Sequence, residues 1–106
     1  MNLNQNLSEQ IIARILSVTQ AERIIIFGSA ASGQMTRDSD IDLLVLQSAP
    51  GNPRQESMRV QQALTGLGYP FDIIFMATER FEESKEVIGG LAYPAHKYGK
   101  AIYKAA

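Results

Sequence analysis

Two aspartates separated by a single residue, Asp40 and Asp42, stand at the start of the apolar segment DIDLLVL. In an extended strand, residues two apart point to the same face, so these carboxylates can converge while Ile41 and Leu43 take the other face. Carboxylates buried beside one another are costly unless a cation neutralises them. Mg²⁺ prefers a few carboxylates together with water and substrate phosphate oxygens. The pair therefore predicts a divalent metal site that serves phosphate chemistry.

A third carboxylate, Asp72, stands near the start of another apolar segment, FDIIFM. If its strand lies beside the first pair, three carboxylates could hold two metal ions about 4 Å apart, an arrangement that stabilises the attacking and leaving oxygens of phosphoryl transfer. Asp72 could also accept the proton of the nucleophile. The alternative is that all three aspartates are exposed strand-end or turn residues, and Asp72 depends on its context more than the pair does.

Gly28 and Ser29 directly follow the apolar segment RIIIF. A glycine lets backbone amides approach a phosphate closely, and the serine hydroxyl can donate to the same group. Alone, a Gly-Ser pair is equally typical of a turn. Here ten residues separate Ser29 from Asp40, which gives the spacing Gly-Ser-x10-Asp-x-Asp.

The elements that must position these residues alternate along the chain. Apolar periodicity, β-branched runs and Gly or Pro punctuation predict helices and strands in alternation. The helices are expected at 7–18, from Met58 to Gly66 or Gly68, and at 78–87, and the strands at 23–27, 40–46 and 71–76, with a turn at 94–98 and a strand or docked tail at 101–103. This order predicts an α/β (α+β) fold, in which a small mixed sheet packs with helices in a single domain over residues 1–106.

The composition excludes several classes of protein. The chain has 106 residues, 10 Lys and Arg against 11 Asp and Glu, and no cysteine, so disulfide scaffolds and thiolate metal clusters are excluded. Its formal charge of −1 is unfavourable for general nucleic-acid binding. No apolar run approaches the roughly 20 residues that span a bilayer, and no secretory signal is visible, so a cytoplasmic protein without a membrane partner is expected.

The run Gly28-Ser29-AASGQMTRDS-Asp40-Ile41-Asp42 resembles the signature of the DNA polymerase beta-like nucleotidyltransferase superfamily. It is most similar to the small prokaryotic members, the minimal nucleotidyltransferases, and FDIIF and YGKAIY fall where that family has its third carboxylate and its tail. The resemblance implies that Gly28 and Ser29 bind the phosphates of ATP. It also implies that Asp40, Asp42 and Asp72 are the catalytic residues and hold Mg²⁺, as two ions, while AMP is transferred to a hydroxyl and pyrophosphate leaves.

The resemblance also implies a partner. Many minimal nucleotidyltransferases act as antitoxins of a helical HEPN-type toxin, and some transfer AMP to a tyrosine of that toxin. Family members commonly carry an arginine just before the second glycine of the loop, where this chain has Ser32; Arg37 could supply a charge nearby. The alternative function is a binding module of little or no activity that neutralises a toxin by forming a complex. Self-association, the base preference and the acceptor stay open.

Other sequence patterns that could indicate a function are either incomplete or less specific. Asp38, Asp40 and Asp42 mimic the start of a calcium-binding EF-hand loop, but Leu43 and Ala49 occupy the positions that require Gly and Glu. No P-loop or dinucleotide fingerprint is present. The C-terminal tyrosines and the methionines have a structural interpretation as packing residues, while the tyrosines could instead stack on an adenine or contact a partner; they are Tyr93, Tyr98 and Tyr103 with Met35, Met58 and Met76.

Overall fold

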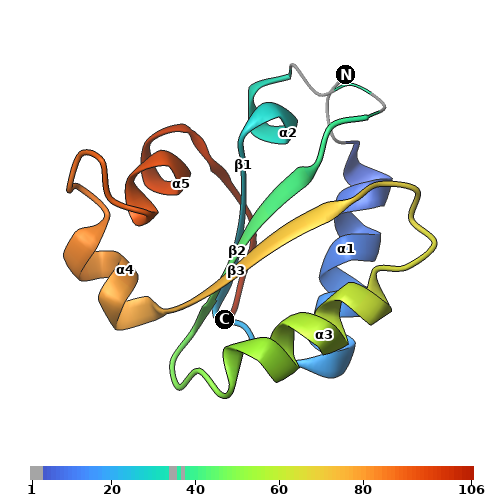
Figure 1. The fold of residues 1–106 in the computed structure, drawn as a ribbon, viewed down its shortest axis with the longest axis horizontal. Helices are drawn as coiled ribbons and strands as arrows, with labels where there is room; N and C mark the ends of the chain where they lie inside the picture. The colour runs from blue at the N-terminus through green and yellow to red at the C-terminus, as the bar shows by residue number, and fades with distance from the viewer. Residues whose placement is uncertain (1–3, 34–35, 37) are drawn as a thin grey trace.

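The computed structural model describes residues 4–33, 36 and 38–106, and shows helices and strands that alternate along the chain up to α4, which α5 follows directly (Figure 1). In chain order the elements are α1 (Gln5–Val18), β1 (Arg23–Phe27), α2 (Ser29–Ser32), β2 (Ile41–Gln47), α3 (Pro53–Ala63), β3 (Phe71–Ala77), α4 (Thr78–Ser84), α5 (Ala92–Tyr98) and β4 (Lys100–Lys104). None of the described helices is long and apolar enough to cross a membrane.

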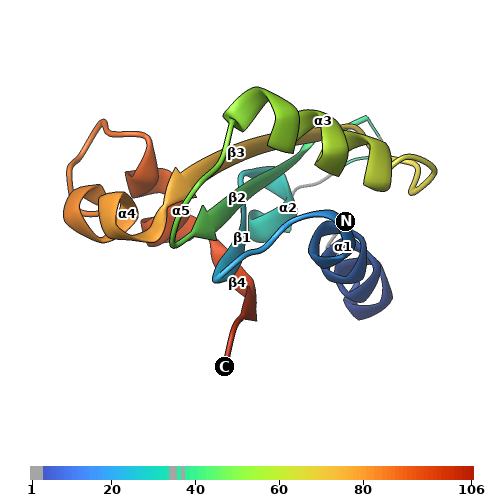
Figure 2. The ribbon, with the colours of Figure 1, turned by 90° about the horizontal axis from the view of Figure 1, so that it is seen from below.

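The strands form one mixed sheet in the order β3-β2-β1-β4 (Figure 2). β1 pairs antiparallel with β2 and with β4, whereas β2 and β3 run parallel and are joined by a crossover through α3. The prediction of a small mixed sheet packed with helices is confirmed. The last strand also resolves the alternative left open for the C-terminal segment, because Ile24 pairs with Tyr103 across β1 and β4.

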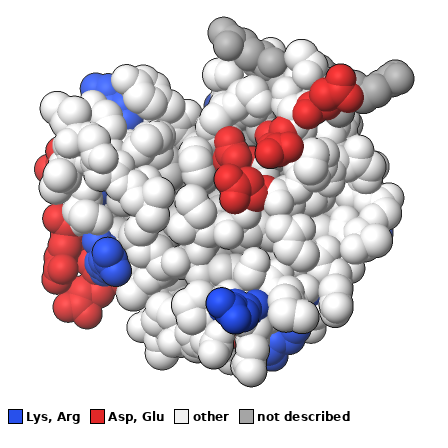
Figure 3. All heavy atoms as spheres, viewed as in Figure 1, with Lys and Arg blue, Asp and Glu red and all other residues white. Residues whose placement is uncertain are grey.

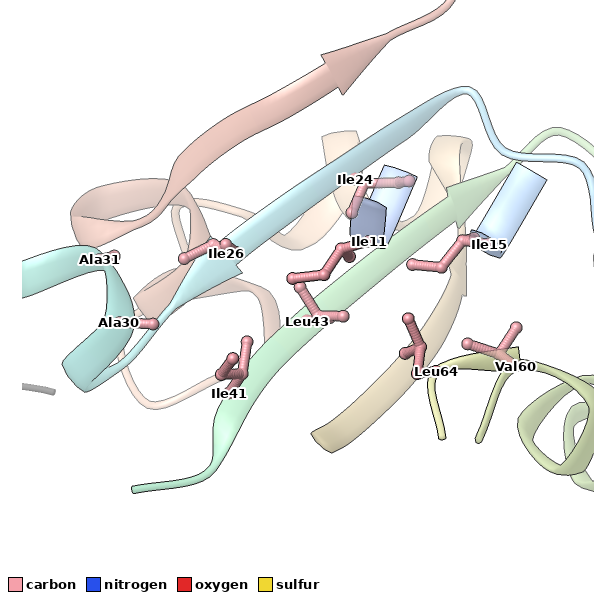
Figure 4. Close-up of a cluster of buried hydrophobic side chains, with 10 residues drawn as sticks. All are labelled: Ile11, Ile15, Ile24, Ile26, Ala30, Ala31, Ile41, Leu43, Val60 and Leu64. Atoms are coloured by element: carbon pink, nitrogen blue, oxygen red, sulfur yellow. The ribbon is translucent and has the colours of Figure 1, made fainter. Parts of the chain in front are cut away.

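Helices cover both faces of the sheet. In Figure 1, α1 and α3 lie on one side of the strands and α4 and α5 on the other. Alternate residues of a strand point to opposite faces. Accordingly Ile24 and Leu43 join the core cluster with α1 and α3, which Figure 4 shows, while Ile25 and Leu44 join the cluster with α4 and α5. This double coverage explains why RIIIF and LLVL are continuously apolar.

The two longest helices begin at side-chain caps. Asn4 accepts a hydrogen bond from the backbone N–H of Leu7 at 2.7 Å and so caps α1. Asn52 accepts from the N–H groups of Arg54 and Gln55, with Pro53 at the first helical position of α3. A capping asparagine satisfies N–H groups that lack a partner within the helix.

Several predicted boundaries differ from the structure. α3 begins at Pro53 rather than Met58, because a proline is tolerated in the first turn of a helix. The segment expected to turn at 94–98 is helix α5, in which Pro94 also lies in the first turn. The helix expected through Val87 ends at Ser84, and the strand expected from Asp40 begins at Ile41.

The packing interpretation holds for some side chains and is wrong for others. Met76 is buried, and Tyr103 packs against the core cluster of α1 and α3. Met58 and Tyr98 are exposed, at 59% and 67%, so neither is a core residue. Met35 lies outside the described residues.

Candidate active site

The parallel pairing of β2 and β3 brings Asp42 and Asp72 side by side. Asp42 is the register partner of Asp72, and the N–H of Ile41 donates to the carbonyl of Pro70 at 2.9 Å just before them. Asp40 directly precedes β2. Since neighbouring strands lie about 4.8 Å apart, residues in register present their side chains together on one face. The structure therefore brings all three predicted carboxylates to the same end of the sheet.

These carboxylates lie on the face of the sheet that α4 and α5 cover further along. Leu44 and Ile74, two residues beyond Asp42 and Asp72 on their strands, contact the core cluster of those helices. Figure 3, drawn from the same side as Figure 1, shows a group of acidic side chains gathered on the surface in the upper half of the molecule. Asp42 is half-buried, whereas Asp40 and Asp72 are exposed, so the site is open to solvent.

The grouping has an electrostatic signature at Asp42. Burial raises the pKa of this carboxyl above its ordinary value of 3.8, and the negative charges of Asp72 and then Asp40 raise it further. Burial and like charges both disfavour the ionised form of an acid. A positive charge beside Asp42 would therefore favour its ionised form.

Gly28 packs directly against Asp42. It directly follows β1, with φ +71° and ψ −150°, a backbone conformation that is essentially restricted to glycine. A Cβ at this position would lie 2.3 Å from Oδ2 of Asp42. Phe27, the preceding residue, is the register partner of Asp42 across β1 and β2. The backbone conformation thus requires a glycine, and any Cβ at this position would displace the carboxylate of Asp42.

The short helix α2 follows Gly28 at once. Ala30 and Ala31 are buried and attach it to the core, while the half-buried Ser29 and the exposed Ser32 lie on its other sides. Gly33 ends the helix in the left-handed conformation, with φ +81°, and its N–H donates to the carbonyl of Ser29. The short helix therefore keeps the backbone of residues 28–33 close to the carboxylates.

The donor set suits a hard cation that is also bound by substrate. No three His, Cys, Asp or Glu side chains of the described residues are grouped closely enough to hold a metal ion by themselves. The three aspartates instead form an open set of oxygen donors centred on Asp42, the carboxyl whose pKa is raised. Mg²⁺ is typically held by one or two carboxylates plus water and phosphate oxygens rather than by an all-protein cage. The residues present therefore fit Mg²⁺ bound together with a nucleotide.

Two positioning interactions could not be recognised from the sequence. The N–H of Thr36 donates to Oγ of Ser39 at 2.9 Å, which orders the approach to Asp40. Nε2 of Gln61, on α3, donates to the carbonyl of Phe71 at 2.8 Å and so holds the start of β3, next to Asp72. A serine before an Asp-x-Asp pair is a weak signal for the first interaction, and nothing in the sequence indicates the second.

The cationic residue proposed to replace the usual arginine of the loop, Arg37, lies outside the described residues. Ser32, at the position of that arginine, contributes only a hydroxyl, which donates to the carbonyl of Ser29 at 3.3 Å. In the described part of residues 28–42 no side chain carries a positive charge. This stretch of the site thus offers three carboxylates and no described cation.

Residues 9–104 match the family model described as polymerase beta, nucleotidyltransferase. The chain therefore belongs to the polymerase beta nucleotidyltransferase family, in agreement with the resemblance of its Gly-Ser-x10-Asp-x-Asp run. Among curated proteins, no match was found.

Solved structures share the fold at low sequence identity. One is a toxin–antitoxin structure with AMP-PNP, which has a TM-score of 0.67 and 20% identity over 92% of this chain and 73% of that chain. A second is a complex of a tri-AMPylated Shewanella oneidensis HEPN toxin with an MNT antitoxin. It has a TM-score of 0.63 and 18% sequence identity, and the match covers 97% of this chain and 74% of that chain. A third is a candidate nucleotidyltransferase from Sulfolobus solfataricus. It has a TM-score of 0.57 and 22% sequence identity, and the match covers 93% of this chain and 78% of that chain.

Proposed function

We propose that this protein is an antitoxin that transfers AMP from ATP to a hydroxyl of a partner protein, a tyrosine of a HEPN-type toxin, with residues 1–106 acting as one nucleotidyltransferase domain. The observation that carries the proposal is the pairing of Asp42 with Asp72 in register, with Gly28 packed against Asp42. Family membership supports the reaction class, and the similar structures with AMP-PNP and with an AMPylated HEPN toxin support the nucleotide and the partner.

In the proposed reaction the acceptor oxygen forms a bond to the α-phosphorus of ATP. The bond between that phosphorus and the oxygen bridging to the β-phosphate breaks, and pyrophosphate leaves with its electron pair. Asp72 takes the proton of the hydroxyl, because it is the exposed carboxylate of the pair and is the easier one for an acceptor to reach. Gly28 and Ser29 bind the phosphates through backbone and hydroxyl.

Asp40, Asp42 and Asp72 would hold two Mg²⁺ ions. When bound, these ions would neutralise the charges of the carboxylates and of the phosphates. This role is consistent with the burial and the repulsion by Asp72 and Asp40 that raise the pKa of Asp42. The three aspartates are the proposed catalytic and metal-binding residues.

A second candidate function is a binding module that neutralises a toxin by complex formation alone. It is favoured by the exposed Ser32 at the position where the family commonly carries an arginine, because the loop then lacks a cation that would bind the phosphates. In that case the carboxylates would contribute little to neutralisation.

Calorimetric titration with ATP, in the presence and absence of Mg²⁺, separates the two functions. We expect Mg²⁺-dependent binding that is lost in Asp40→Asn, since only the native site binds the nucleotide. Asp38→Asn is the matched control, because Asp38 is an exposed carboxylate of the same segment that does not contribute to the raised pKa of Asp42. Toxin neutralisation that persists in Asp40→Asn would favour the binding module.

A further inference from the structure

β3 forms one border of the sheet, and half of its backbone faces away from β2 (Figure 2). The carbonyl of Pro70 accepts from Ile41, so the even-numbered residues that follow direct their N–H and C=O groups to β2. The groups of Phe71, Ile73 and Phe75 then point outward. Gln61 occupies the carbonyl of Phe71, but in the described part of the chain no loop or side-chain hydrogen bond reaches Ile73 or Phe75.

This border lacks the features that usually prevent strand pairing. Exposed edges are commonly protected by lysines, prolines or inward-pointing charges. The other border, β4, has a lysine at each end, Lys100 and Lys104, whereas β3 reads FDIIFMA and has Asp72 as its one polar side chain. Figure 3 shows a largely uncharged surface below the acidic group on this side of the molecule.

Cavities border both ends of β3. One of about 460 Å³ is lined by Tyr69, Pro70 and Phe71 at the start of the strand. Another of about 290 Å³ is lined by Phe75 and Met76 at its end, with Arg80 of α4 and Leu91, which directly precedes α5. Peptides that add to a sheet edge gain affinity from main-chain hydrogen bonds and specificity from pockets for their side chains. β3 offers both.

We propose that the acceptor protein docks by adding an extended segment to the outer edge of β3. The segment forms hydrogen bonds with the backbone of Ile73 and Phe75 and presents a hydroxyl-bearing side chain to Asp72. The inference rests on the proposed transfer of AMP and specifies how the active site binds the acceptor protein. Continuity with the site is the main argument, because Asp72 belongs to β3 itself and shares the face of Asp42.

The geometry of an antiparallel partner defines where the hydroxyl must stand. Residues directly opposite one another share a face, so a residue opposite Ile74 lies on the same face as Asp72. The diagonal from that position to Asp72 is roughly 7–8 Å, which an aromatic side chain can span. A tyrosine opposite Ile74, between two residues that pair with Ile73 and Phe75, therefore reaches the carboxylate with its hydroxyl.

The probe for this docking is a blocked pentapeptide, acetyl-Gln-Val-Tyr-Val-Gln-amide, compared with the same peptide N-methylated at both valines. Amide hydrogen exchange of the protein, measured by NMR with Mg²⁺ and AMP-PNP, should slow at Ile73 and Phe75 with the first peptide only. Mass spectrometry of the peptide, with ATP and Mg²⁺, should show AMP addition that falls about tenfold on N-methylation, as expected for the loss of hydrogen bonds of ordinary strength.

Ile73→Pro removes the outward N–H from the protein side, and Ile73→Ala is the matched control that shortens the side chain and keeps the N–H. Proline is tolerated in an edge strand where its nitrogen faces solvent, and thermal unfolding verifies that both variants are folded. Transfer to the peptide should fall about tenfold further in Ile73→Pro than in Ile73→Ala, as for the N-methylated peptide.

The outcomes separate the docking from the function on which it rests. Transfer that is equal for both peptides, or protection of neither amide in a protein that binds ATP, overturns the docking and leaves the function intact. Protection without transfer supports the docking and counts against the function. Protection of Ile73 and Phe75 without peptide, in a concentration-dependent dimer, overturns the proposal in favour of a second copy of this chain.

Discussion

Replacing Asp42 by asparagine should stabilise the fold while abolishing AMP transfer. Asp42 stands in register with Asp72 on a neighbouring strand, and burial together with Asp72 and Asp40 raises its pKa. Charges about 5 Å apart repel by about 1 kcal/mol in water-like surroundings, the limit that suits the exposed Asp72. Removing this repulsion should raise the Tm by roughly 4–8 °C.

The sign of the effect reverses the usual behaviour of a paired carboxylate. Because the folded-state pKa of Asp42 lies above 3.8, the folded protein binds more protons than the unfolded chain between those two values. The native protein therefore loses stability from this group as the pH rises through that window. The advantage of Asp42→Asn should be fully present above the folded-state pKa and absent below 3.8.

Differential scanning calorimetry at neutral and acidic pH, without Mg²⁺, measures the change in Tm, and the AMP-transfer assay measures activity. Asp38→Asn is the control for loss of one surface charge, and its effect should stay within about 0.5 kcal/mol. A lower Tm for Asp42→Asn at neutral pH would refute the reasoning, because it would mean that Asp42 gains more from its folded surroundings than it loses by repulsion.

Two further predictions concern Gly28 and Glu82. Gly28→Ala should cost about 1–3 kcal/mol of stability in denaturant unfolding and displace the carboxylate of Asp42, so that Mg²⁺-dependent ATP binding is lost; Gly66→Ala, at a positive φ with nothing within 4 Å, should keep that binding. A hydrogen bond from Lys85 lowers the pKa of Glu82 below 4.5, so its stabilisation is present above 4.5 and lost as the pH falls through the lowered value. In Lys85→Ala, NMR titration should show the pKa of Glu82 moving back toward 4.5, and an unchanged value would contradict the role of Lys85.

The elements that the sequence predicted well are those whose apolar pattern reflects burial on the sheet. RIIIF and the LLVL segment are covered on both faces, and a continuous apolar run is the expected pattern for such strands. α1 shows the periodicity of one buried stripe, with Ile11 and Ile15 in the core. Two of the errors occurred where proline was interpreted as a breaker, at Pro53 and Pro94, although both lie in a first helical turn.

The carboxylates were found from the sequence, but their mutual arrangement was not. Two residues apart on one strand is a local relation, so Asp40 and Asp42 could be grouped from spacing alone. The register that sets Asp72 opposite Asp42 depends on the parallel crossover through α3, and the contact of Gly28 with Asp42 depends on the antiparallel return of the chain. Both are tertiary relations, which local spacing does not specify.

The contact between Gly28 and Asp42 bears on how such a protein could change over generations. The fold carries a glycine in a conformation closed to other residues, a partly buried carboxylate beside it and a second one opposite, each of which lowers stability. A chain used only to cover a partner would have no reason to keep them, because most positions drift toward whatever folds adequately. Loss of Asp42 would free the space beside Gly28 but leave its backbone conformation unchanged, so an alanine there would stay strained and the glycine would outlast the carboxylate as the site decayed. The present sequence keeps both residues.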